Sequence, residues 1–176
     1  MSSSTWKFDP AHTSIDFRIR HAAISWVKGT FREWSGSIDF DPDHPERVFT
    51  QLTVDLSSVD TGVKDRDDHL RSGDFFDVAN YPEMTFASTD VTSHGGERYR
   101  LAGDLMLHGV SKRVIFDVAF CGVTADPWGV TRAGFEASAV IDRRDWGLIW
   151  NQTMESAGVL VGDTVEVTIE AEVVKG

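Results

Sequence analysis

The stretch VEVTIEAEV, Val165 to Val173, alternates strictly between apolar and polar residues. Its odd-numbered positions, including Ile169, are apolar, and the positions between them are glutamate or threonine. Successive side chains of a β-strand point to opposite faces of the sheet. This period of two therefore predicts a strand with one face in a core and the other in water.

The same alternation recurs along the chain and predicts an all-β protein. It appears in seven further stretches, at residues 14–20, 34–40, 51–56, 84–89, 98–107, 113–120 and 131–141. Turn-forming sequences such as DPDHPER and SHGGER separate these stretches, and no linker or repeat interrupts the series. We therefore expect one domain over residues 1–176, built from eight antiparallel strands.

Eight such strands form either a closed barrel or a two-sheet sandwich. Small residues in the apolar phase of the strands favour a barrel with a cavity, because an eight-stranded barrel is just wide enough to hold a small ligand. These residues are Gly36, Gly103, Ala133, Ala137 and Ala139. In the alternative, large neighbours such as Trp34, Phe86 and Phe116 fill the interior, and the spacing alone leaves both readings open.

The charge balance restricts the partners. Of 176 residues, 17 are Lys or Arg and 28 are Asp or Glu, which gives a formal net charge of −11. Nucleic acids and anionic membranes attract positive charge, so we expect no nucleic-acid binding and at most transient membrane contact. The N-terminal MSSSTWKFDP lacks the features of a secretory signal, and no apolar run approaches the ~20 residues that span a bilayer. The sequence thus predicts a cytoplasmic protein and leaves a homodimer open.

The segment TGVKDRDDHLRSG, residues 61–73, lacks strand alternation and carries a candidate catalytic cluster, Asp65, Asp68 and His69. It overlaps the stretch RDDHLRSGDFFDVANYP, residues 66–82. Asp65 and His69 lie four residues apart, on one face of a helix. A catalytic zinc site usually needs three protein ligands, and no other histidine shows a paired spacing, so we expect no metal. The simpler interpretation is a short helix that ends at Gly73, with acids in its first turn and Arg71 in its last. Nucleophile-elbow and phosphate-loop motifs are absent from the sequence.

Two further segments carry cations next to turns. HGVSKRV places Lys112 and Arg113 after a tight turn, and RRDWG places Arg143 and Arg144 beside Trp146. Guanidinium and indole groups together can anchor a phosphate or quinone head, or form a solvated barrel rim. The rim is the simpler reading for RRDWG, and a plain hairpin is the simpler reading for HGVSKRV.

Four segments in order resemble the YceI-like family of polyisoprenoid-binding proteins. They are W-x-x-D-P-x-H-T-x-I-x-F at residues 6–17, RDDHLRSGDFFDVANYP at 66–82, GDLMLHGVSKRV at 103–114 and PWGVTRAGFEASAVIDRRDWG at 127–147. The resemblance implies a lipocalin-like, eight-stranded antiparallel β-barrel with one or two short capping helices. It further implies an apolar channel that holds an isoprenoid or similar lipid, and no established catalysis. Many family members carry a leader and act in the periplasm, a role that does not transfer to this sequence.

Within the barrel that the resemblance implies, the apolar phase of the strands indicates which residues would contact the ligand. The apolar channel would comprise Phe17, Trp34, Ile38, Leu52, Val54, Phe86, Leu105, Leu107, Phe116, Val118, Phe135, Ala137 and Ala139. Residues 66–82 would form a lid, and the lid and head-group contacts would comprise Arg66, His69, Leu70, Arg71, Phe75, Phe76, Lys112 and Trp146.

We therefore expect storage, transport or sequestration of a long apolar lipid, an isoprenoid quinone or a polyprenyl phosphate. Burial of each methylene group of the tail contributes ~0.8 kcal/mol relative to water, but the bilayer in which such a lipid resides already provides this stabilisation. Selective binding of the lipid by the protein must therefore come from the shape of the channel and from contacts with the head group. Catalytic cofactors are not expected. Two alternatives remain: an enzyme that acts on such a lipid through Asp65, Asp68 and His69, and a stress-related barrel with a filled interior and no ligand.

Overall fold

The computed structural model describes residues 5–154 and 158–176. Its one α-helix is α1 (Lys64–Arg71), and its 3-10 helices are η1 (Pro10–His12), η2 (Pro45–Arg47), η3 (Leu56–Ser58) and η4 (Arg143–Trp146). The strands are β1 (Trp6–Phe8), β2 (Ser14–His21), β3 (Ser25–Phe31), β4 (Trp34–Asp39), β5 (Phe49–Asp55), β6 (Val59–Asp60), β7 (Glu83–Ser93), β8 (Arg98–Leu107), β9 (Val110–Ala125), β10 (Thr131–Asp142) and β11 (Val161–Lys175).

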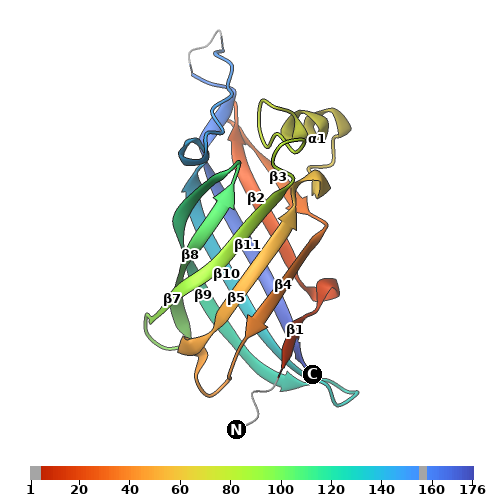
Figure 1. Ribbon diagram of the computed structural model, residues 1–176, viewed down its shortest axis with the longest axis vertical. Helices are drawn as coiled ribbons and strands as arrows, with labels where there is room; N and C mark the ends of the chain where they lie inside the picture. Colours follow the sequence, from red (N-terminus) through yellow and green to blue (C-terminus); the bar gives the residue numbers. More distant parts are fainter. Residues whose placement is uncertain (1–4, 155–157) are drawn as a thin grey trace.

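The strands form one closed antiparallel barrel (Figure 1). The sheet order is β1-β4-β5-β7-β8-β9-β10-β11-β2-β3-β6, and pairing of β1 with β11 closes the ring. Trp6 carries this closure, since it is paired with Lys175 on one side and with Ile38 on the other. The closed ring rules out the two-sheet sandwich.

The eleven β segments correspond to eight strands of the barrel, because three of these strands are each interrupted once. β1 and β2 both pair with β11, β3 pairs with β2 and β6, and β4 pairs with β1 and β5. Hence β1/β2, β3/β4 and β5/β6 each act as one strand, and the prediction of an eight-stranded lipocalin-like barrel is confirmed. The alternation pattern missed β1 and β6 because they have only three and two residues. It missed β3 because Trp26 faces outward and obscures the alternation.

One end of the barrel is filled by aromatic side chains. Trp6, Phe40, Ala133 and Val173 form a buried cluster there, against which Phe8, Ile38, Val48, Phe120 and Phe135 pack. The ring of Phe40 makes edge contacts with Trp6, Phe120 and Phe135 at centroid distances of 5.5, 5.5 and 4.9 Å. We call this end, near the chain termini in Figure 1, the closed end.

The glycines in the apolar phase do not leave the space that the sequence predicts. A Cβ on Gly103 would collide with the ring of Phe86, and it would lie 2.5 Å from the carbonyl oxygen of Ala87. A Cβ on Gly36 would lie 2.5 Å from Cδ2 of Leu52. Both glycines therefore accommodate large neighbours, which corrects the expectation that they open a cavity.

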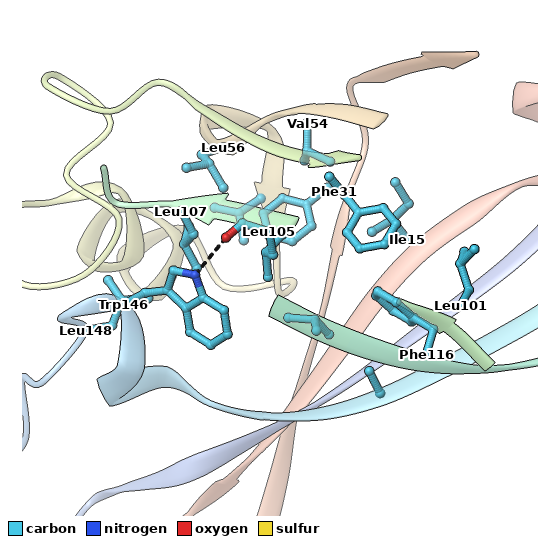
Figure 2. Packing of buried hydrophobic residues seen from close by; sticks show 14 residues of the cluster. Ile15, Phe31, Val54, Leu56, Leu101, Leu105, Leu107, Phe116, Trp146 and Leu148 are labelled. Atoms are coloured by element: carbon cyan, nitrogen blue, oxygen red, sulfur yellow. Dashed lines mark hydrogen bonds between the residues drawn. The ribbon is translucent and has the colours of Figure 1, made fainter. Parts of the chain in front are cut away.

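Opposite the closed end, α1 and η4 lie at the other rim (Figure 1). Trp146 of η4 is only 2% exposed, and its Nε1 donates a hydrogen bond to the carbonyl oxygen of Leu105 at 3.0 Å (Figure 2). A buried indole N–H needs such a partner, so this bond fixes η4 onto β8. Trp146 is thus a core residue, which corrects its assignment to the head-group contacts.

Replacement of Gly103 by alanine should destabilise the barrel, because the added methyl group displaces the ring of Phe86. Overpacking of this kind costs about 1–3 kcal/mol. The measurement is the free energy of unfolding in urea. Gly73→Ala is the control, since a Cβ there has no neighbour within 4 Å and the residue has no positive φ. Equal stability of the two variants would contradict the packing.

Candidate functional site

A cavity of about 540 Å³ opens at the rim that carries α1. Most of its wall is apolar and comes from eight strands, and the cap from α1 to Phe76 covers part of its mouth. Figure 2 shows buried residues of this wall, including Phe31, Leu105 and Phe116. The interior of the barrel is therefore open at one end and filled at the other.

Many of the residues assigned from the sequence line this cavity. They are Phe17, Leu52, Val54, Phe86, Leu105, Leu107 and Phe116 on the strands, and Arg66, His69, Leu70, Phe75 and Phe76 in the cap.

Six assigned channel residues do not line it. Ile38 and Phe135 pack at the closed end, whereas Trp34, Val118, Ala137 and Ala139 pack against the main core. All six were chosen by their apolar phase, and phase gives the direction of a side chain but not its depth in the barrel. The channel assignment is corrected for these positions because aromatic rings fill the lower interior.

Part of the cavity wall comes from residues that were not assigned to the channel from the sequence. Phe31 and Val27 come from the overlooked strand β3, and Ile15 and Ile19 share the inward face of β2 with Phe17. On β11, Val165, Val167 and Ile169 line the cavity, and these are the residues of the alternating stretch that indicates the fold. Their alternation was a sufficient signal for the inward face.

The cap is attached to the barrel through a buried carboxylate. Asp67 is 7% exposed and accepts hydrogen bonds from the backbone N–H and Oγ1 of Thr61, at 2.8 and 2.6 Å. Arg66 donates to Oγ1 and to the carbonyl oxygen of Thr61, each at 2.7 Å. Arg71 donates to the carbonyl oxygens of Ser57 at 2.8 Å and Val59 at 3.2 Å. Arg66 and Arg71 therefore hold the helix in place.

An aromatic cluster joins the cap to the opposite rim. The ring of His69 makes edge contacts with Phe75 and Trp150 at centroid distances of 5.0 and 4.6 Å. Phe75 and Trp150 are 5.4 Å apart. Nε2 of His69 also lies 2.9 Å from a carboxylate oxygen of Asp74. These contacts narrow the mouth and leave its lining largely apolar.

Arg143 shapes that rim. Its side chain is 4% exposed and donates to the carbonyl oxygens of Leu148, Gly162 and Trp150 at 2.6, 2.8 and 3.0 Å. Burial lowers the pKa of this guanidinium. Arg144 instead pairs with Asp142 at 2.6 Å and lowers the pKa of that carboxyl to about 2. Only Arg144 fits the interpretation of RRDWG as a solvated rim, because Arg143 and Trp146 are buried.

The candidate catalytic residues have separate partners. Asp68 pairs with Lys64 at 2.7 Å and with Arg71 at 3.0 Å, and the hydrogen bond from Lys64 lowers its pKa. His69 faces Asp74, while Asp65 lies at the mouth. The three side chains do not form a group with metal-binding geometry in the described part of the chain.

Lys112, the remaining residue assigned to the head group, is exposed on β9 and does not line the cavity. It shares the phase of Val114, two residues on, which lines the cavity, but Lys112 lies nearer the start of the strand, where its side chain is exposed. We therefore remove Lys112 from the head-group contacts.

Near the closed end, tertiary structure assembles Asp9, His12 and Glu172, whose ligand atoms lie within 4.8 Å of one another. Arg132 donates to Asp9 at 2.8 Å, to Asp126 at 2.9 Å and to Glu172 at 3.1 Å. The hydrogen bond from His12, followed by that from Arg132, lowers the pKa of Asp9, and Arg132 lowers the pKa of Asp126. The guanidinium of Arg132 therefore neutralises these carboxylates in the way that a bound cation would.

Arg132→Met should lower the melting temperature at pH 7 and have less effect in acid. Carboxyls with lowered pKa values stabilise the fold above their unfolded pKa of about 4, and they lose this contribution as the pH falls through the lowered values. Thermal melts from pH 7 to pH 2 measure the difference. The control is Arg113→Met, which removes an exposed pair with Asp90 and should change little. A difference that does not depend on pH would contradict the network.

Residues 6–173 match the YceI-like domain family. The chain belongs to the YceI-like family. It is 45% identical over 135 residues to UPF0312 protein plu2095 of Photorhabdus laumondii, a match that covers 77% of this chain and 70% of that protein. It is 42% identical over 137 residues to Protein YceI of Escherichia coli O157:H7, covering 78% and 71%.

Solved structures show the same fold. The YceI protein of Campylobacter jejuni superposes with a TM-score of 0.77 at 31% identity, covering 90% of each chain. Burkholderia cenocepacia BcnA gives 0.82 at 23% identity, covering 94% of this chain and 99% of that one. A polyisoprenoid-binding domain from Saccharophagus degradans gives 0.74 at 18% identity, covering 98% and 99%. In the described residues of this YceI-like protein, no helix is long and apolar enough to cross a membrane.

Proposed function

We propose that this protein binds a long isoprenoid-type lipid, with the apolar tail in the barrel cavity and the head group at the mouth. The observation that carries the proposal is the cavity itself, about 540 Å³ with an apolar wall and one open end. Apolar pockets of this size hold small hydrophobic ligands. Family membership and the polyisoprenoid-binding domain from Saccharophagus degradans support the same ligand class.

The head group is uncharged, as in an isoprenoid quinone. Arg66 and Arg143 both line the mouth, yet their guanidinium groups already donate to Thr61 and to rim carbonyls. Arg20 also borders the cavity, but its guanidinium lies over the Trp26 ring on the outer face of the hairpin. Asp65 also lies at the mouth, where a phosphate would meet its negative charge. A neutral head group needs no free arginine and is not repelled by a carboxylate. The quinone is therefore favoured over the polyprenyl phosphate. The protein acts as a carrier, without catalysis or a catalytic cofactor.

Organic extraction of the purified protein, followed by mass spectrometry, should recover an isoprenoid lipid. Val167→Trp should reduce the amount strongly while the protein stays folded, because Val167 lines the cavity and the indole occupies open space. Thr168→Trp on the outer face is the control and should carry as much lipid as the parent. If Val167→Trp were strongly destabilised and the parent protein carried no lipid, the alternative of a barrel with a filled interior and no ligand would be favoured.

The head-group preference has its own test. A quinone and a polyprenyl phosphate of equal tail length should differ by roughly tenfold in Kd, about 1.4 kcal/mol, with the quinone tighter. Competition for a fluorescent fatty probe in the cavity measures both. Tighter binding of the phosphate would overturn the uncharged head while leaving the lipid-binding proposal in place.

Elemental analysis of protein purified without chelator should find no stoichiometric metal. Asp68 is engaged by Lys64 and Arg71, and the carboxylates beside His12 are engaged by Arg132. About one zinc or iron per chain would contradict this expectation and revive the enzyme reading.

A further inference from the structure

The hairpin of β2 and β3 carries a basic and aromatic outer face. The guanidinium carbons of Arg18 and Arg20 lie 4.2 and 4.0 Å from the centroid of the Trp26 ring. In the ladder Arg20 is paired with Trp26, and Arg18 is paired with Lys28, so all four side chains share the outward face. We call these four residues the hairpin patch.

The patch keeps free positive charge in an acidic protein. Arg18 forms an ion pair with Glu166. Arg20 and Lys28 have no acidic partner within 4.0 Å among residues 5–154 and 158–176. Asp16, the acid on the same face of β2, is paired with Thr30 and lies further from the hairpin tip than Arg18. The cations nearest the tip are therefore available to an anionic partner, despite the net charge of −11.

The tip of the hairpin is apolar and borders the cavity mouth. Ile24 is 84% exposed. The N–H of Ala22 donates to the carbonyl oxygen of Leu160 at 2.8 Å, which joins the tip to the opposite rim, and Leu160 lines the cavity. On that rim Ile149 and Val159 are 71% and 44% exposed. Single exposed apolar residues are ordinary, but these three stand at one opening beside the cationic patch.

We propose that the mouth of the barrel docks on an anionic lipid bilayer through this hairpin. Ile24 enters the boundary of the acyl chains, Trp26 lies among the head groups, and Arg20 and Lys28 contact lipid phosphates. Trp at the membrane interface and basic residues at an anionic surface have these preferences. A lipid surface matches the combination of an apolar tip, an interfacial indole and free cations.

The role of this docking rests on the proposed function, because docking turns the cavity mouth toward a bilayer that can supply the lipid ligand. The overall negative charge repels an anionic bilayer at longer range. The attachment is therefore weak and sensitive to salt, since screening reduces the local attraction between the basic residues and the lipid phosphates.

Co-sedimentation with vesicles tests the proposal. The parent should pellet with phosphatidylcholine vesicles that contain phosphatidylglycerol, less with phosphatidylcholine alone, and less at high salt. Ile24→Ser and Lys28→Glu should each reduce the bound fraction several-fold, because each removes one of the proposed contacts. Neither side chain lines the cavity.

The matched controls lie elsewhere on the barrel. Trp128→Ser removes a side chain that is 85% exposed in the turn between β9 and β10, and Arg98→Glu makes the same charge change on β8. Both should bind like the parent. Equal binding to the two vesicle types, or an equal loss in the controls, would overturn the docking.

Mass spectrometry of lipid carried by the same proteins separates the two proposals. A parent that carries lipid but ignores vesicles overturns the docking and leaves the function standing. A parent that binds anionic vesicles but carries nothing supports the docking and overturns the proposed function.

Discussion

Ring closure at β1 is the constraint on which the rest of the structure depends. Trp6 is paired with Lys175 of β11 and with Ile38 of β4, so the first and last strands of the chain leave no free edge. An unpaired edge would expose backbone donors and acceptors, and closure satisfies them. A closed ring also separates an inside from an outside along every strand. The cavity exists only because this separation is complete around the barrel.

The depth of the interior is set by packing at the closed end. Phe40 contacts Trp6, Phe120 and Phe135, and this aromatic cluster occupies the lower part of the barrel. Above it, large residues such as Phe86 fit because Gly103 has no side chain to oppose the ring. The same barrel is therefore a packed core at one end and a lipid-sized cavity at the other.

The open end is fixed by polar groups that are buried and paired. Asp67 of the cap accepts a hydrogen bond from Thr61, and Arg143 donates hydrogen bonds to carbonyl oxygens of the rim. A buried charge without partners would be costly, so these bonds make the cap and rim specific in shape. They also occupy Arg66 and Arg143, two of the cations that line the mouth. The cationic side chains that remain free near the mouth, Arg20 and Lys28, face outward on the hairpin patch.

The sequence by itself determined the alternation of the strands, and with it the all-β class and the inward face that includes Phe17, Leu105 and Val167. It also determined the short helix before Gly73. Only the tertiary structure decided depth and partners. Phe135 and Phe116 have the same inward phase, but the aromatic cluster buries the first at the closed end while the second lines the cavity. Phase is a local property of the backbone, whereas depth depends on strand tilt and on side chains distant in sequence.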